Sequence, residues 1–133
     1  ATGVDGAAAM IAELRRRVPQ VEAIHADMRR LALNRRFDVI LAFNSLFHLA
    51  PDDQRAMFAV FAAHAAPGAT LLFTSGPAAG EAWGRVGQSA VYHASLDPAE
   101  YRALLDRHGF ATVWFRPEDA AFRGHSVWLA RSA

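Results

Sequence analysis

The chain has 133 residues, of which 53% are hydrophobic and 20% charged, a composition typical of one folded domain and not of a disordered chain. Its formal net charge of +1 excludes a strong attraction to nucleic acid or to a membrane surface, and the absence of cysteine excludes disulfides and thiolate metal sites. No apolar run reaches the roughly 20 residues needed to cross a bilayer, and the first residues do not resemble a signal peptide. We therefore predict a cytoplasmic protein with a single domain over residues 1–133.

The first part of the chain alternates strand patterns with a helix pattern. Short apolar runs predict strands over residues 2–4, 21–26 and 37–42. Between the first two runs, hydrophobic residues 10, 11, 14 and 18 fall at helical spacing, and Pro19 ends that helix. After the third run, residues 44–49 are predicted to form a turn.

The second part of the chain continues this alternation. Pro51 begins a predicted helix, because proline suits the first helical turn and the following acids suit the helix dipole. A strand is expected over residues 69–75, and the glycine-rich residues 76–95 are predicted to be the longest loop. Asp97 caps the next helix. Residues 111–115 and 126–131 follow as two strands that pair antiparallel.

This order of elements defines the expected fold class. Alternating strands and helices predict an α/β protein, a Rossmann-like three-layer sandwich with a mostly parallel sheet and an antiparallel C-terminal strand pair. Ligands in such sheets bind beyond the carboxyl ends of the strands. Asp5, Asp27 and residues 44–48 each follow a predicted strand, so these positions are candidates for a ligand site.

Asp5 and Asp27 each have two interpretations. A carboxylate in the position of Asp5 can accept both hydroxyls of a ribose, but then a glycine-rich turn should lie about 20 residues earlier. The sequence has no room for that turn, so we expect the N-terminal βα unit of the fold to be missing. Asp5 could equally be a turn residue before Gly6. Asp27 could bind an adenine amino group, but the residues alone favour a loop carboxylate paired with Arg29 or Arg30.

Four segments together resemble class I S-adenosylmethionine (SAM)-dependent methyltransferases. Residues 2–11 resemble the second strand and following helix of that family, and residues 26–28 (Ala-Asp-Met) resemble its adenine-binding motif. Residues 37–49 resemble its fourth strand, with an Asn-Ser-x-x-His-Leu turn similar to that of glycine N-methyltransferase-like enzymes. Residues 66–73 resemble the segment leading into its fifth strand. The four motifs occur in the family's order, and the resemblance extends over nearly the whole chain.

The resemblance implies a cofactor, SAM, and a position for each part of it. Asp5 would hold the ribose hydroxyls with Gly6 beside it, and Asp27 with Met28 would hold the adenine. The carbonyl of Ala42, with Asn44 and His48 nearby, would hold the methionine part. The cofactor-binding residues implied by the resemblance are therefore Asp5, Gly6, Asp27, Met28, Ala42, Asn44 and His48. The missing first strand and Gly-x-Gly loop would leave a sheet edge exposed, which predicts self-association into a homo-oligomer.

Methyl transfer needs few side chains, because alignment of the reacting atoms supplies most of the effect. A general base would add to it, and His48, Tyr92 and His93 are the candidates. Tyr92 and His93 could instead serve only in loop packing. Trp83 could line an acceptor pocket or be a packing anchor.

Other site types have less support. The six histidines lack metal-ligand spacing, so no metal is expected. The arginine clusters at residues 15–17, 29–30 and 35–36 are balanced by 13 acids and are better explained as solvated surface than as a nucleic-acid site.

Three functional hypotheses remain open. The first is a SAM-dependent methyltransferase that acts on an unidentified small-molecule methyl acceptor, without nucleic-acid or membrane partners. The alternative is a truncated or non-catalytic methyltransferase-fold fragment that self-associates and binds SAM weakly or not at all. The third, an NAD-dependent Rossmann enzyme, fits the turn at residues 44–48 less well.

Overall fold

A computed structural model describes residues 1–122 and 124–133. They divide into two compact units, residues 1–33 and residues 34–133, called here the N-terminal and the C-terminal unit. A single domain over the whole chain stays a prediction.

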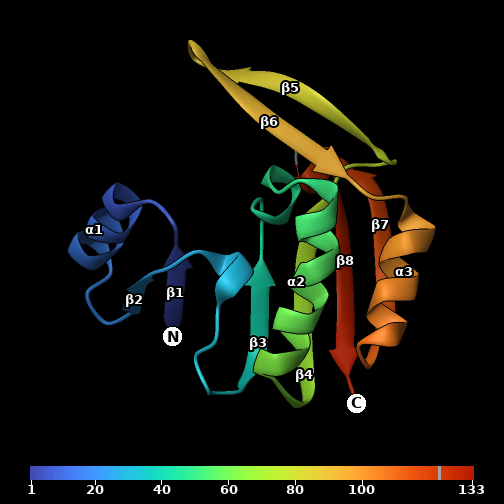
Figure 1. Cartoon of the computed structure of the whole chain (residues 1–133), viewed down its shortest axis with the longest axis horizontal. Helices are drawn as coiled ribbons and strands as arrows, with labels where there is room; N and C mark the ends of the chain where they lie inside the picture. Colours follow the sequence, from blue (N-terminus) through green and yellow to red (C-terminus); the bar gives the residue numbers. More distant parts are fainter. Residues whose placement is uncertain (123) are drawn as a thin grey trace. The chain divides into compact units, whose positions relative to one another are not determined.

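The N-terminal unit is a strand–helix–strand motif, as predicted. It contains β1 (Thr2–Asp5), α1 (Ala8–Arg17), β2 (Glu22–His25) and the short 3-10 helix η1 (Met28–Arg30). β1 and β2 pair in parallel, so their carboxyl ends lie side by side, with Asp5 opposite His25 (Figure 1). Ile11, from the predicted apolar face of α1, is only 2% exposed.

A four-stranded sheet forms the centre of the C-terminal unit. Its strands are β3 (Phe37–Ala42), β4 (Ala65–Ser75), β7 (Phe110–Asp119) and β8 (His125–Ser132), in the order β3-β4-β8-β7. β3 and β4 are parallel, whereas β8 runs antiparallel to both β4 and β7. The structure confirms the α/β class and the antiparallel C-terminal pair.

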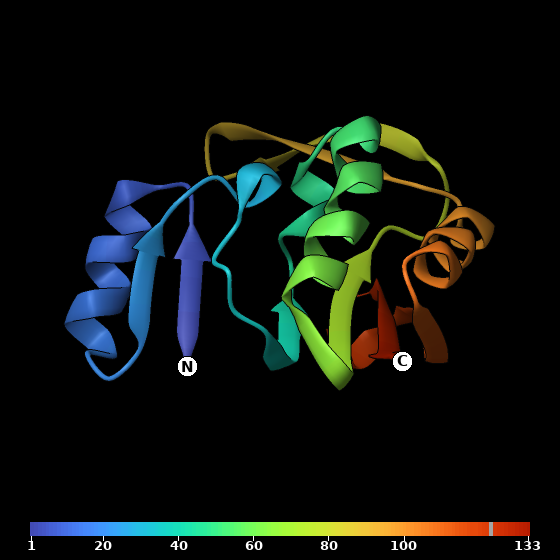
Figure 2. The same ribbon diagram turned by 60° about the horizontal axis from the view of Figure 1, so that its bottom comes forward.

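Two helices cover one face of this sheet, α2 (Pro51–His64) over β4 and α3 (Pro98–Arg107) over β7 (Figures 1 and 2). Pro51 is the first residue of α2, and the carboxylate of Asp97 caps α3 by accepting a hydrogen bond from the Ala99 N–H at 2.8 Å. No helix in the described part of the chain is long and apolar enough to span a membrane.

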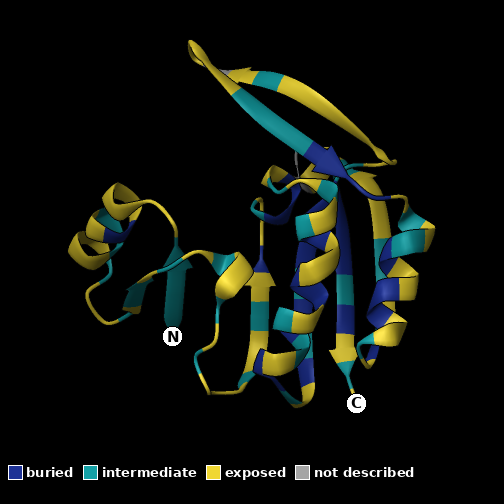
Figure 3. Ribbon diagram, viewed as in Figure 1, coloured by how far each residue is buried: buried dark blue, intermediate teal, exposed yellow. Residues whose placement is uncertain are grey.

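Aromatic side chains fill the space between the helices and the sheet. Phe58, Phe73, Tyr101 and Trp128 are all fully buried. The rings of Phe73 and Trp128 stack at a centroid distance of 5.7 Å, and the Phe58 ring meets that of Phe73 edge-on at 5.5 Å. Such ring pairs add about 0.5–1.5 kcal/mol each beyond burial. This core lies beneath α2 and α3, and Figure 3 shows parts of β4 and β8 as buried there.

Strand β3 lies at one end of this sheet. Among the described strands it pairs only with β4, so its other edge is open. Val39, Leu41 and Phe43 alternate along one side of the chain here and are 58%, 66% and 45% exposed. The C-terminal unit therefore carries an apolar stripe on the sheet face opposite α2 and α3.

Residues 76–95 correct the sequence prediction, because they form a β-hairpin and not an irregular loop. Its strands are β5 (Gly80–Val86) and β6 (Ser89–Ser95), which pair antiparallel. Gly87 has φ 62° and begins the two-residue turn, as in a type II′ hairpin. The glycines that suggested a loop instead supply the turn and small positions along β5.

Candidate functional site

In the N-terminal unit, Asp5 and Asp27 follow two adjacent parallel strands. The Asp5 carbonyl accepts a hydrogen bond from the Ala26 N–H at 3.1 Å, which ties the two strand ends together. One carboxylate oxygen of Asp5 accepts from the Ala7 N–H at 2.8 Å. Its other oxygen makes no hydrogen bond within the described residues. Asp5 therefore shapes the turn at Gly6 and retains an open acceptor at the strand end.

Asp27 is paired with Arg29, the state that the residues alone favoured. Its Oδ1 accepts from the Arg29 backbone N–H at 3.0 Å, and its Oδ2 lies 2.6 Å from the guanidinium. These hydrogen bonds lower the pKa of Asp27 to about 2. Because both oxygens already have partners, an adenine amino group would have to share one of them. Met28 begins η1 immediately afterwards.

In the C-terminal unit, Ala42 and Asn44 mark the end of β3. Ala42 is buried, and Asn44 has a left-handed backbone with φ 51°. The Asn44 N–H donates to the hydroxyl of the fully buried Thr74 at 2.8 Å, and that hydroxyl lies 3.4 Å from the Asn44 side-chain oxygen. Thr74, near the end of β4, thus holds the start of the turn in a fixed conformation.

The turn continues into η2 (Leu46–His48), where three imidazoles surround one phenyl ring. The centroids of His48, His93 and His125 lie 4.8, 5.1 and 4.9 Å from that of Phe47. His48 and His93, two of the three predicted base candidates, are 5.0 Å apart. Sequence reasoning missed His125, because no spacing pattern links it to the other two. Within the described residues, no group of three or more possible ligands could hold a metal ion.

One hydrogen bond fixes the chemical state of His48. Its Nδ1 lies 3.2 Å from the backbone carbonyl oxygen of Tyr92. A carbonyl can only accept, so Nδ1 carries the hydrogen, and in the neutral ring Nε2 has the free lone pair. The His48 side chain is exposed, and Nε2 can therefore accept a proton from a ligand.

The Tyr92 side chain has a different partner from its carbonyl. Its hydroxyl donates to Glu81 at 2.9 Å, and its ring meets Trp83 at 5.3 Å. Partial burial and the Glu81 carboxylate raise the pKa of the Tyr92 phenol, which keeps it protonated at neutral pH. This arrangement favours the histidines over Tyr92 as proton acceptors.

A cavity of about 480 Å³ lies beside this cluster, within the size range of small-molecule sites. Phe47, His93 and His125 form one part of its lining, and Trp83, which the sequence left open as a pocket residue or a packing anchor, also borders it. Ala82 pairs with His93 across the hairpin, and the ring of His93 faces Gly84. Small residues on this face of β5 leave the cavity open above the His93 ring.

Gln54 belongs to the same region, although its role was not predicted. It is fully buried in α2, and its side-chain nitrogen donates to the carbonyls of Leu49 and Ala94 at 2.9 and 2.8 Å. A signal was present, since Gln54 lies on the helix face that carries Met57, Phe58 and Phe61. A polar residue on an apolar face requires hydrogen-bond partners.

Comparison with known proteins agrees with this architecture. A family model described as a methyltransferase domain matches residues 1–68, which is 68 of the 133 residues of the chain. The chain belongs to this methyltransferase-domain family, and the predicted family is confirmed. No curated protein sequence matches the chain.

Solved methyltransferase structures share the fold. The SAM-bound amino pentose methyltransferase CalS10 of Micromonospora echinaspora superimposes with a TM-score of 0.80 at 20% identity, over 99% of this chain and 73% of that one. The glycopeptide N-methyltransferase MtfA, in complex with S-adenosylhomocysteine, gives 0.79 at 17% identity over 99% and 73%. A SAM-dependent methyltransferase of Clostridium acetobutylicum gives 0.79 at 12% identity over 99% and 74%.

Proposed function

We propose that this protein is a SAM-dependent methyltransferase that acts on a small molecule. The observation that carries the proposal is the His48–His93 pair beside a cavity of ligand size, in a chain of the methyltransferase-domain family. Similar solved structures add support, since CalS10 was determined with SAM and MtfA with SAM and its demethylated product.

Each unit carries candidate residues for a part of the cofactor. Asp5 has an open carboxylate oxygen for a ribose hydroxyl, with Gly6 next to it, and Asp27 with Met28 is the candidate for the adenine. In the C-terminal unit, the carbonyl of Ala42 and the side chains of Asn44 and His48 are the candidates for the methionine part. When bound, SAM supplies a methyl group already activated by a positively charged sulfur.

The remaining chemistry concerns the acceptor. The cavity beside His93 would hold it and limit its freedom, and alignment of this kind can contribute about 7–11 kcal/mol to catalysis. His48 would take the acceptor's proton at Nε2, while Nδ1 stays bonded to the Tyr92 carbonyl. His93 borders the cavity directly and is the second candidate for that proton.

Calorimetric titration with SAM and with S-adenosylhomocysteine tests the proposal. Binding is expected for the unaltered chain, and Asp5→Asn should weaken it about tenfold or more, because a charge-assisted hydrogen bond is replaced by a neutral one. Asparagine retains the side-chain oxygen that accepts from Ala7, so the turn should persist. Asp106→Asn, an equal charge change on the exposed side of α3, should bind as the unaltered chain does. Absence of heat with both compounds would rule out the function.

A second candidate keeps the fold and removes the activity. In it the chain self-associates and binds SAM weakly or not at all, and the exposure of Val39, Leu41 and Phe43 favours the association.

The NAD-dependent alternative is tested by titration with NADH in the same calorimeter, and no heat of binding is expected. The cytoplasmic location and the absence of nucleic-acid and membrane partners stay predictions.

A further inference from the structure

The outer edge of strand β6 is attached to the rest of the C-terminal unit through two carbonyls. Residues two apart on a strand direct their carbonyls to the same side, and Tyr92 and Ala94 are such a pair. The Tyr92 carbonyl accepts from His48, and the Ala94 carbonyl accepts from Gln54. His48 and Gln54 therefore bind adjacent positions on the same strand edge.

Gln54 also binds the backbone next to His48. Its side-chain nitrogen donates to the carbonyl of Leu49, the residue that follows His48. One amide group thus bonds both the backbone next to His48 and the strand that supplies the partner of His48. Gln54 therefore fixes the backbone close to both partners of the His48–Tyr92 hydrogen bond, at Leu49 beside His48 and at Ala94 two residues after Tyr92.

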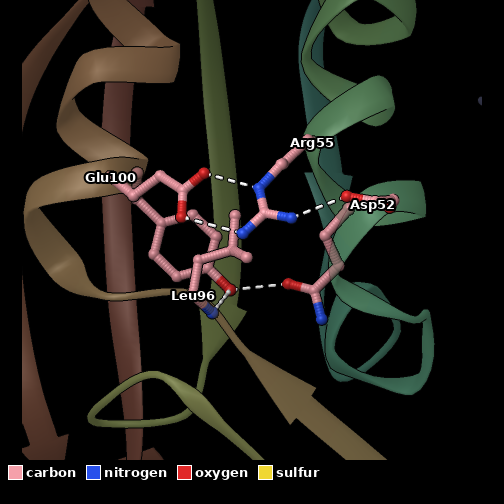
Figure 4. Close-up of polar contacts among 6 residues, drawn as sticks. Asp52, Arg55, Leu96 and Glu100 are labelled. Carbon is pink, nitrogen blue, oxygen red and sulfur yellow. Dashed lines mark hydrogen bonds and ion pairs between the residues drawn. The ribbon is translucent and has the colours of Figure 1, made fainter.

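The orientation of this amide is itself fixed by Tyr101. The Tyr101 hydroxyl accepts from the Leu96 N–H at 3.1 Å, shown in Figure 4, so its own hydrogen is directed to the side-chain oxygen of Gln54 at 2.6 Å. That oxygen accepts, and the amide nitrogen must face the two carbonyls. Gln54 and Tyr101 are both fully buried, which excludes water as a competing partner.

We propose that Gln54 is a positioning residue that keeps His48 in its Nδ1–H form and so leaves Nε2 available as the proton acceptor. The inference rests on the proposed function, because that function gives His48 its role as a base. Gln54 acts through the backbone on both sides of the His48–Tyr92 hydrogen bond and need not touch either substrate.

Arg55 offers a matched control. It is the next residue in α2 and links that helix to α3 by an ion pair with Glu100 at 2.6 Å, and it pairs with Asp52 of its own helix at 2.7 Å (Figure 4). Its contacts lie on the exposed surface and do not include η2 or β6. A variant of Arg55 therefore weakens the contact between the helices without changing the surroundings of His48.

The test is nitrogen NMR of the imidazole rings in the full chain, which reports the tautomer without any need for an acceptor. The unaltered chain should show His48 with hydrogen on Nδ1. In Gln54→Met the ratio of the Nδ1–H form to the Nε2–H form should fall about two- to tenfold, as expected for a weakened hydrogen bond. Arg55→Met should leave the ratio unchanged.

Tyr101→Phe is the second variant, and it keeps the test decisive if Gln54→Met does not fold. It frees the Gln54 amide to rotate, so a smaller fall in the same ratio is expected. A folded Gln54→Met or Tyr101→Phe chain with the unaltered His48 tautomer would overturn the inference. The SAM titration is independent of this result, so failure of the proposed function is seen separately.

Discussion

At the scale of single residues, the two tyrosines show how burial decides the role of a hydroxyl. Tyr101 lies in the core, where burial raises the pKa of its phenol and its oxygen serves Gln54 and Leu96. Tyr92 lies on the hairpin and bonds the exposed Glu81. The same group is part of a closed network in one place and of a surface contact in the other.

Phenylalanine substitutions at these positions should therefore differ in cost. Tyr101→Phe leaves a buried acceptor and a buried donor without a partner, so we expect the free energy of unfolding to fall by about 1–3 kcal/mol. Tyr92→Phe loses a hydrogen bond that water can replace, and the fall should stay below about 1 kcal/mol. Urea unfolding of both variants measures the difference. Equal losses of unfolding free energy in the two variants would show that water can replace the hydrogen bonds of Tyr101 as well.

Asp27 gives a prediction about pH. Arg29 holds its pKa at about 2, below the usual value. A depressed pKa means that the carboxylate stabilises the fold above the unfolded-state pKa, near 3.8, and that this contribution disappears as the pH falls through about 2.

Arg29→Gln should raise the Asp27 pKa toward its ordinary value, because the hydrogen bond from the Arg29 side chain is the largest cause of the lowered pKa. Arg30→Gln should raise it less, since Arg30 acts only through its charge. Carbon NMR of the Asp27 carboxyl group during an acid titration follows both changes. A larger effect from Arg30 would contradict the pairing described above.

At the scale of elements, two glycines in and beside the hairpin have different surroundings. A methyl group on Gly76 would lie 2.9 Å from the Ser95 side chain at the hairpin base, whereas one on Gly84 would lie 3.7 Å from the His93 ring. The first distance is a clash, and the second is ordinary contact.

Gly76→Ala should lower the free energy of unfolding by about 1–3 kcal/mol through overpacking. Gly84→Ala should leave stability unchanged or raise it by about 0.4–1 kcal/mol, because alanine restricts the unfolded chain. Thermal and urea unfolding of the two variants provide the comparison. A stable Gly76→Ala protein would mean that the hairpin base moves to accept the methyl group.

The elements also show what the sequence could reveal. Residues 51–64 were predictable, because Pro51, the following acids and the apolar face of the helix all indicate the same structure. Residues 76–95 were not, because four glycines in this stretch suggest a loop and hide the strand pattern of β5. The signals for the helix all indicate one structure, whereas the same glycines can mark a loop or supply the turn of a hairpin.

For the molecule as a whole, one part of the candidate residues could likewise be predicted from the sequence and another part could not. Their places after predicted strands put Asp5, Asp27 and Asn44 among the candidates, since ligands of α/β proteins bind beyond the carboxyl ends of strands. The contacts of Phe47 with three histidines, and those of Gln54, required the tertiary structure, because they join η2, α2, β6 and the start of β8.

The apolar stripe on β3 predicts the state of the chain in solution. We expect the unaltered chain to associate with rising concentration, and Leu41→Arg to reduce this association, because the charge breaks an exposed apolar surface without entering the core. Met10→Arg, at an exposed position of α1, should behave as the unaltered chain does. Sedimentation velocity at several concentrations measures the mass. A monomer at every concentration would remove the stripe as an association surface.

The bond from His48 to the Tyr92 carbonyl has a consequence for the proposed proton transfer. Proton uptake at Nε2 leaves the Nδ1 hydrogen in place, so the contact is kept in both charge states of the ring. A positively charged donor binds a carbonyl more strongly than a neutral one. The hydrogen bond that holds the hairpin to η2 would therefore be strongest just after the acceptor has lost its proton to His48. It would weaken again when the imidazole releases that proton to water.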